Sequence, residues 1–263
     1  MFKYVYNDLD VAHKYDRVPK PSPEYAKHYH DFYEMFYFVK GKAFFTVEEE
    51  KQVMSFGDIL LIQPGVHHFV TFFENAPYER YVLKFQDELV PDFLKNFFIK
   101  RSAFFTSVPN IQKLFRKLDS LYRDFNAMEL EILFSNVITE ILIRLNHTEF
   151  KQKAVESDDD ESITKIIQYI NENIRKNITI EELCDKFHFS QSHLYKEFQT
   201  YMRTPIMKYI RSKKIIAANQ LIRRGEKPTK VAEQFGFMEY STFYRSFIDV
   251  MGYPPSRTKS KNN

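Results

Sequence analysis

The chain has 263 residues, 44% of them hydrophobic, which is enough for about two domains with buried cores. One cysteine excludes an intramolecular disulfide, and without a signal-peptide core or a run of about 18 apolar residues we expect a cytoplasmic protein with no membrane contact. The net charge of +3 is uneven: residues 161–263 carry 18 Lys and Arg against 10 Asp and Glu (+8), and residues 1–160 carry 20 against 25 (−5). A basic C-terminal part is typical of a protein that contacts a polyanion, although an ordinary solvated surface gives the same balance.

Residues 31–85 have the composition of antiparallel strands. Their runs of Phe, Tyr, Val and Ile are separated by Gly41, Gly57 and Pro64. Short strands with such turns predict a small barrel or sandwich over about residues 1–90.

Four histidines and a glutamate gather in this strand region. The segment HYHDFYEMFYFVKG has the spacing H-x-H-x3-E-x6-G, and QPGVHH adds two histidines, which together give His28, His30, Glu34, His67 and His68. The spacing resembles the first motif of the cupin family, and alternate residues of a strand share a face. Such a cluster either binds a divalent metal, as in a metal-dependent cupin enzyme, or lines a ligand pocket. We expect these five residues to bind a ligand.

Residues 108–148 change to a helical period. Apolar residues recur every three or four positions, at Leu114, Leu118, Leu121, Phe134, Val137, Ile138, Ile141, Leu142 and Leu145. This spacing predicts two helices packed against the barrel. A spare apolar face there would pair two subunits, unless the helices only close the chain's own core. We therefore expect a sensing and dimerisation domain over residues 1–150.

Residues 151–161 are polar and end in four consecutive acids, which predicts a linker. Beyond them, residues 162–263 contain one pattern twice, as LYKEFQTYMRTP from Leu194 and as FYRSFIDVMGYP from Phe243. Each copy follows a short apolar stripe and a turn, which is the plan of a helix-turn-helix motif.

We expect the first motif at about 180–201, a connecting helix at about 205–223 and the second motif at about 228–251. Arg211, Lys213 and Lys214 are predicted on the outer side of the connecting helix.

The repeated helices have a polar face opposite their buried one. Because positions i, i+3, i+4 and i+7 share a face, Ser192, Tyr195 and Lys196 lie together if Leu194 and Phe198 face inward. Hydroxyls and a cation on an outward helix suit the major groove of DNA, although tyrosines can be buried against a neighbouring helix and cations can be merely solvated. The residues that we expect to contact DNA are Gln191, Ser192, His193, Tyr195, Lys196, Glu239, Tyr240, Ser241, Tyr244 and Arg245, with Arg211 and Lys213 on the backbone.

Residues 162–259 resemble the DNA-binding domain of the AraC/XylS family of transcriptional regulators. The resemblance rests on the two motifs, on the connector YIRSKKIIAANQLI and on VAEQFGFMEYSTFYRSF, whereas His188 replaces the usual turn glycine. It implies two helix-turn-helix motifs in one chain, and sensor domains of that family often carry the same histidine and glutamate pattern without metal. We therefore expect an α+β protein with a cupin-like β-barrel, and no catalytic residue, metal or cofactor.

The resulting hypothesis is a homodimeric regulator that binds double-stranded DNA in response to a small effector, with a carbohydrate expected from family analogy. Two alternatives stay open: a metal-dependent cupin enzyme with accessory helices, and a DNA-binding protein that needs no ligand.

Overall fold

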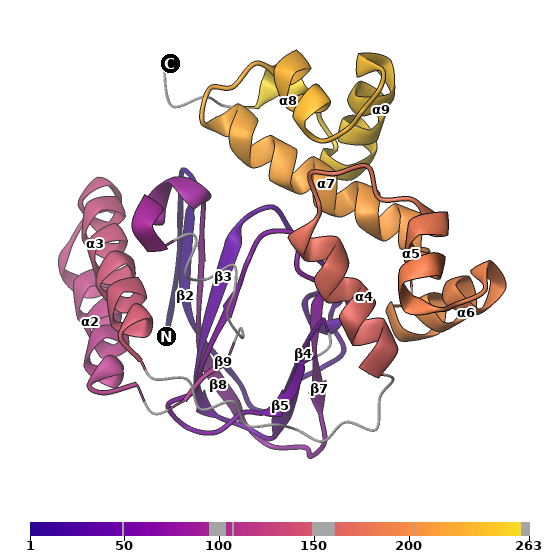
Figure 1. Ribbon diagram of the computed structural model, residues 1–263. Coiled ribbons are helices and arrows are strands. Elements are labelled where there is room, and N and C mark those ends of the chain that lie inside the picture. The colour runs from indigo at the N-terminus through magenta and orange to yellow at the C-terminus, as the bar shows by residue number, and fades with distance from the viewer. Residues whose placement is uncertain (49, 95–103, 107, 149–160, 203, 259–263) are drawn as a thin grey trace. The chain divides into compact units, whose positions relative to one another are not determined.

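The computed structural model describes residues 1–48, 50–94, 104–106, 108–148, 161–202 and 204–258 (Figure 1). The chain forms two compact units, Met1–Val155 and Glu156–Asn263. Unit 1 contains antiparallel sheets and two long helices, and unit 2 is helical in its described part. This arrangement confirms the predicted two-domain α+β fold class. The predicted linker, residues 151–161, lies outside the described residues except for its last position, where the first helix of unit 2 begins.

Unit 1 is built on two sheets whose strands all pair antiparallel. The larger sheet has the order β1-β2-β8-β3-β6-β9 and the smaller one β5-β4-β7. The strands are β1 (Phe2–Tyr6), β2 (Leu9–Asp16), β3 (Tyr33–Lys40), β4 (Ala43–Val47), β5 (Glu50–Val53), β6 (Ile59–Ile62), β7 (His68–Phe72), β8 (Tyr78–Phe85) and β9 (Phe104–Phe105). The 3-10 helices η1 (Pro23–Tyr25) and η2 (Asp87–Leu89) join some of them.

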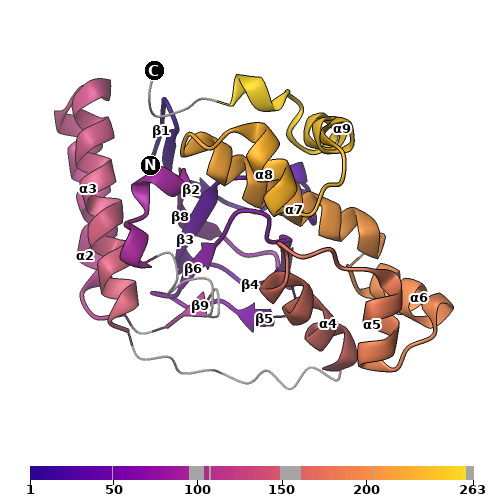
Figure 2. The ribbon, with the colours of Figure 1, turned by 45° about the horizontal axis from the view of Figure 1, so that its top comes forward.

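Two helices cover one face of the larger sheet (Figures 1 and 2). They are α2 (Ile111–Asp124) and α3 (Ala127–Asn146), and α3 begins at a capping box in which Asn126 and Glu129 satisfy each other's backbone N–H groups. The predicted apolar stripes of both helices are buried. Their burial follows from the helical period, which places every third or fourth side chain against the sheet.

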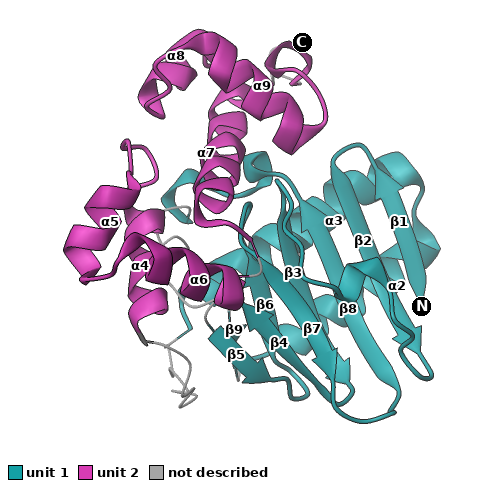
Figure 3. Cartoon of the chain, turned by 90° about the vertical axis from the view of Figure 1, so that its right-hand side faces the viewer, with its two compact units in different colours: residues 1–155 teal, residues 156–263 magenta. Residues whose placement is uncertain are grey.

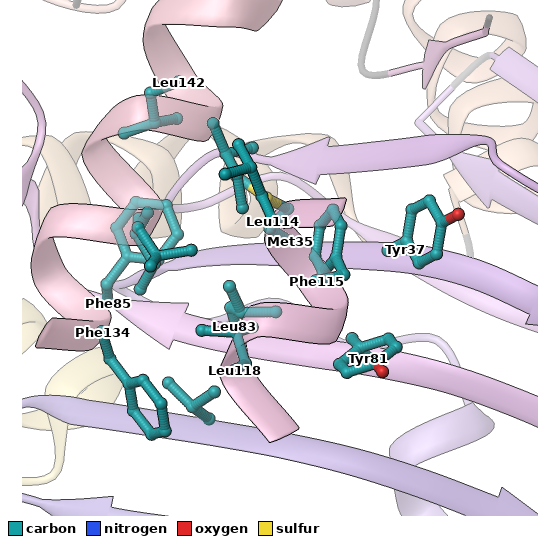
Figure 4. Close-up of a cluster of buried hydrophobic side chains, with 14 of the residues drawn as sticks. Met35, Tyr37, Tyr81, Leu83, Phe85, Leu114, Phe115, Leu118, Phe134 and Leu142 are labelled. Carbon is teal, nitrogen blue, oxygen red and sulfur yellow. The ribbon is translucent and has the colours of Figure 1, made fainter. Parts of the chain in front are cut away.

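Strand β3 is buried on both of its faces, which explains its nearly unbroken apolar sequence. Met35 and Tyr37 belong to the core between the sheet and the helices, where Tyr37 stacks on Phe115 of α2 with ring centroids 4.3 Å apart (Figure 4). Phe38, on the opposite face, belongs to a second core that includes β4 of the smaller sheet. Since successive side chains of a strand alternate, Glu34 shares the face of Phe38 and points away from the helices.

Unit 2 holds two helix-turn-helix motifs joined by one helix (Figure 3). Its helices are α4 (Glu161–Glu172), α5 (Ile180–Phe187), α6 (Gln191–Met202), α7 (Ile206–Arg223), α8 (Pro228–Gln234), α9 (Tyr240–Met251) and the 3-10 helix η3 (Pro255–Arg257). The first half of α7 packs with α4, α5 and α6, and its second half packs with α8 and α9. Because α7 contributes to both cores, it connects the two motifs rigidly.

The two motifs turn at equivalent positions with left-handed backbone. His188 ends α5 at φ 58° and ψ 40°, and Gly236 follows α8 at φ 73°. Glycine adopts this conformation without a steric cost, whereas histidine is among the residues that tolerate it. The histidine therefore keeps a left-handed turn at the position where the AraC/XylS resemblance implies a glycine.

The predicted outward position of Lys214 is wrong. The side chain is 7% exposed, and its Nζ donates a hydrogen bond of 2.9 Å to the carbonyl of Phe235 at the end of α8. Burial lowers the pKa of Lys214. Because helix ends leave carbonyl groups without intrahelical partners, this lysine joins α7 to the second motif instead of facing solvent.

Candidate DNA-binding helices and effector pocket

Helices α6 and α9 bury equivalent apolar side chains. Leu194 and Phe198 of α6, and Phe243 and Phe247 of α9, are each 0% exposed. Ser190 precedes α6, and its Oγ accepts a hydrogen bond of 3.3 Å from the backbone N–H of His193, as an N-cap residue does. These contacts fix the rotation of each helix about its axis, and therefore which side chains face outward.

The opposite faces of α6 and α9 are exposed. Tyr195 and Tyr244 occupy matching positions and are 43% and 38% exposed. All ten residues predicted to contact DNA are exposed, namely Gln191, Ser192, His193, Tyr195, Lys196, Glu239, Tyr240, Ser241, Tyr244 and Arg245. The structure thus places them on surfaces that a ligand can reach.

The cations on these faces have no protein partner within the described residues: neither Lys196 nor Arg245 has a hydrogen bond or ion pair there. By contrast, His193 lies 3.6 Å from Glu197, and Ser241 Oγ donates to Glu239 Oε2 at 3.2 Å. An exposed cation without a partner keeps its full capacity to donate to a phosphate or a base edge.

The two candidate backbone contacts on α7 differ in exposure. Arg211 is exposed, whereas Lys213 is half-buried with its Nζ 5.5 Å from the centroid of the Tyr209 ring. A lysine often lays its aliphatic stem along the protein while its charge stays near water, and the partial burial of Lys213 fits this arrangement.

The predicted ligand residues of unit 1 form a compact cluster. Backbone N–H groups of His28 and His68 each donate to the other's carbonyl, at 3.1 and 3.0 Å, which pairs the two histidines across a β-bridge. The carbonyl of His30 accepts a hydrogen bond of 2.7 Å from the Gly65 N–H. Glu34 comes from β3, so three chain segments converge on one point.

The side-chain distances in this cluster are short. Nε2 of His30 lies 3.1 Å and Nε2 of His68 lies 3.3 Å from the same oxygen, Oε2 of Glu34. Nδ1 of each imidazole lies beside a backbone carbonyl: Ala26 O at 2.7 Å for His28, Phe32 O at 2.8 Å for His30 and Val66 O at 2.9 Å for His68.

The surroundings of the cluster favour neutral histidines beside a charged glutamate. Burial lowers the pKa of His28 and of His30, because a charged imidazole loses its hydration there. Burial acts to raise the pKa of Glu34, but the neighbouring imidazoles of His30 and His68 and the charge of Lys84 outweigh it and hold that pKa well below the usual range. Glu34 is therefore a carboxylate at neutral pH.

His67 lies outside this cluster. It is buried, and its ring centroid is 4.8 Å from that of Tyr29. Because His67 and His68 are adjacent in an extended segment, their side chains leave the backbone on opposite sides. Of the five predicted ligand residues, the structure brings together His28, His30, Glu34 and His68.

Two cations of β8 were not predicted as site residues. Lys84 pairs with Glu34 in the β3–β8 register, and its Nζ lies 3.1 Å from Glu34 Oε1. Arg80, four positions earlier on the same face, is 3% exposed, forms an ion pair with Asp16 and donates to the Tyr25 hydroxyl at 3.0 Å. Two basic residues four positions apart, on one face of a largely apolar strand, were the signal in the sequence.

These side chains surround a pocket on the inner face of the larger sheet. About 420 Å³ of empty space, its open mouth included, lies among them, of which about 30 Å³ can hold the centre of a water molecule. The enclosed part therefore fits an ion or a few waters, and a larger ligand extends into the mouth or displaces side chains. The lining consists of Lys14, Glu24, Tyr25, His28, Glu34, Phe36, Phe45, His68, Phe69, Val70, Tyr78, Arg80, Val82 and Lys84.

Comparison with protein families matches both units. Residues 15–138 match the model of an AraC-like ligand binding domain, and residues 183–261 match a helix-turn-helix domain. The chain belongs to the AraC family of transcriptional regulators. It is accordingly a DNA-binding transcriptional regulator with a ligand-binding domain, and its relatives among curated proteins are regulators. No described helix is long and apolar enough to cross a membrane.

Three similar proteins illustrate the family. The uncharacterized HTH-type transcriptional regulator YbfI of Bacillus subtilis is 21% identical over 83% of this chain and 81% of its own. The raffinose operon transcriptional regulatory protein RafR of Pediococcus pentosaceus is 22% identical over 86% of this chain and 84% of its own. The crystal structure of ToxT from Vibrio cholerae is 17% identical, with a TM-score of 0.38 over 95% of this chain and 96% of that one.

Proposed function

We propose that this AraC-family protein binds two successive major grooves of DNA, through α6 and α9, in response to a small molecule held in the pocket of unit 1. The observation that carries the proposal is the pair of equivalent exposed faces, each with a tyrosine, a serine and a cation that has no partner among the described residues. Hydroxyls and cations of this kind donate to base edges and phosphates.

The connecting helix supports simultaneous binding. The 18 residues of α7 span about 27 Å at about 1.5 Å per residue, and the two motifs pack at its opposite ends (Figure 1). Successive major grooves on one side of B-DNA are separated by about 34 Å. A rigid helix of this length, with the width of a recognition helix added, suits two adjacent grooves better than one. Arg211 and Lys213 of this helix would contact the phosphates between them.

A carbohydrate is the effector class that we propose. The pocket offers aromatic faces, such as Phe36 and Tyr78, beside charged groups that hydrogen-bond hydroxyls, among them Glu34, Arg80 and Lys84. Sugars bind through ring faces together with a few fixed polar groups. The name of the regulator RafR, which refers to a raffinose operon, points in the same direction.

A second copy of the chain is the proposed partner of unit 1. Helix α3 leaves Met128, Ile132 and Ile143 exposed, at 66%, 65% and 39%, and these positions share one helical face. Phe125, just before α3, is 43% exposed.

We further propose that residues 1–150 form a sensing and dimerisation domain, that residues 151–161 form a linker, and that residues 162–263 form a DNA-binding domain. We also propose that the protein acts in the cytoplasm.

The effector can change DNA binding only if it binds one arrangement of the chain better than another.

The direct test is selection of genomic DNA fragments by the purified full chain, followed by measurement of the affinity for those fragments with and without a panel of sugars. We expect a specific fragment and at least one sugar that changes its Kd. Failure to retain any fragment at moderate salt would overturn the DNA proposal, and a specific fragment unaffected by every sugar would overturn the carbohydrate proposal.

A further inference from the structure

The three histidines of the pocket cluster share one hydrogen-bonding pattern. Nδ1 of His28, His30 and His68 each lies 2.7 to 2.9 Å from a backbone carbonyl. A carbonyl oxygen only accepts, so each Nδ1 must carry the proton and donate it. In the neutral imidazole this leaves a lone pair on every Nε2, the nitrogen that turns toward Glu34 in His30 and His68.

This pattern leaves the centre of the cluster without enough donors. His30 Nε2 and Glu34 Oε2 lie 3.1 Å apart, and both are acceptors when the imidazole is neutral. Nε2 of His68 is buried and has no hydrogen-bond partner among the described residues, although Glu34 Oε2 lies 3.3 Å away. A second proton on His30 would connect one imidazole to the carboxylate, but it would leave the lone pair of His68 unsatisfied.

A metal ion satisfies all of these atoms together. Two ligands about 2.0–2.1 Å from a tetrahedral ion are about 3.3 Å apart, close to the separations of Glu34 Oε2 from His30 and His68. One ligand atom from each of the four residues lies within 4.8 Å of the others. The widest separation must shrink, which the half-exposed His28 permits by rotation.

The surroundings resemble those of a ligand set. Metal-bound histidines usually donate their other ring N–H to a carbonyl or carboxylate, which fixes the ring and raises its basicity. Lys84 holds the other carboxylate oxygen, Oε1, at 3.1 Å, so that Oε2 is directed at the histidines.

The geometry points to a binding site for a divalent transition metal ion, formed by Nε2 of His28, His30 and His68 and by Oε2 of Glu34. Three imidazoles and one carboxylate suit zinc, cobalt or nickel better than magnesium or calcium, which prefer oxygen ligands. Sequence reasoning expected a metal-free pocket, because the tautomers and the unsatisfied Nε2 of His68 become visible only in the structure.

The ion would lie on the wall of the effector pocket, which His28, Glu34 and His68 also line. A hydroxyl or carboxylate of the effector would reach it from the pocket. This role rests on the proposed function of that pocket, but metal binding itself does not, so the experiment reads metal binding and DNA binding separately.

The test uses the untagged full chain, freed of metal with a chelator and titrated with Co²⁺. We expect one Co²⁺ per chain, visible absorption bands of a nitrogen-ligated ion, and displacement of Co²⁺ by Zn²⁺. His30→Ala and Glu34→Gln should each weaken Co²⁺ binding about 100-fold or more. His147→Ala, which removes an exposed histidine at the end of α3, should bind as the parent does.

Two outcomes would overturn the site: no stoichiometric Co²⁺ or Zn²⁺ at micromolar concentrations, or binding that survives both His30→Ala and Glu34→Gln. Circular dichroism verifies that each variant is folded, and His28→Gln, at the least buried ligand, provides a substitution that spares the core. DNA affinity is measured on the same metal-free samples. Normal DNA binding with no metal binding would reject the metal site alone.

Discussion

Replacing Arg245 by alanine tests whether α9 distinguishes bases. The side chain is exposed and has no hydrogen bond or ion pair within the described part of the chain, so its loss should change the free energy of unfolding by no more than about 0.5 kcal/mol. If the guanidinium donates two hydrogen bonds to a guanine, its removal should weaken specific binding by about 1–3 kcal/mol. That corresponds to about a 5- to 150-fold rise in Kd.

The assay is fluorescence anisotropy with the selected DNA site and with versions altered at one base pair at a time. Arg245→Ala should lose discrimination at one position and keep it elsewhere. Lys196→Ala, at the matching position of α6, should act on the other half of the site. Arg123→Ala is the charge-matched control, because it removes an exposed arginine from α2 in unit 1.

Arg245→Lys separates a base contact from a phosphate contact, since lysine keeps the charge and loses the two-pronged geometry. The reasoning is refuted if Arg245→Ala weakens every DNA sequence equally and lowers the slope of log Kd against log salt by about 0.9, which is the signature of one phosphate contact. Restoration of full discrimination by Arg245→Lys would also contradict a bidentate contact.

Three further outcomes are expected. His188→Gly should raise the free energy of unfolding of unit 2 by about 0.5–1 kcal/mol, because glycine relieves the strain of the left-handed backbone. Gly236→Ala should lower the same free energy by about 1 kcal/mol. Urea unfolding measures both changes, and a His188→Gly protein less stable than the parent would disprove the strain. The double substitution Met128→Glu and Ile132→Glu should raise the dimer dissociation constant about tenfold or more. Sedimentation equilibrium measures this constant, and an unchanged value would show that α3 is not part of the interface. The lowered pKa of Lys214 means that its ammonium proton is bound more tightly in the unfolded chain than in the folded one. The free energy of unfolding should therefore rise as the pH increases from the folded pKa of Lys214 toward 10.5. Lys214→Met should lack this rise, and an identical pH dependence of stability in the parent and the variant would contradict the shift.

The helices of both units were predictable because their packing follows a local period. Apolar side chains at spacings of three and four identified α3, and Leu194 with Phe198 identified the buried side of α6. Since the buried side fixes the exposed side of a helix, the exposure of Tyr195 and Lys196 followed without knowledge of the fold. The strand region was recognised from composition, because aromatic and β-branched residues favour sheets.

Sequence reasoning failed where a side chain depends on a distant partner. Lys214 is buried because a carbonyl at the end of α8, 21 residues away, needs a donor. Lys84 enters the pocket because the register of β3 and β8 places it opposite Glu34. His67 and His68 could not be told apart, since the side of the segment that faces the pocket is set by the β-bridge to His28.

The most direct measurement is methylation interference on the selected DNA site with the full chain. Two short blocks of essential guanines should appear in the major groove on one face of the duplex, about 10 base pairs apart for each bound chain. Arg245→Ala should weaken one block, and Lys196→Ala should weaken the other. A single block per chain, or two blocks that respond together to either substitution, would contradict simultaneous binding by α6 and α9.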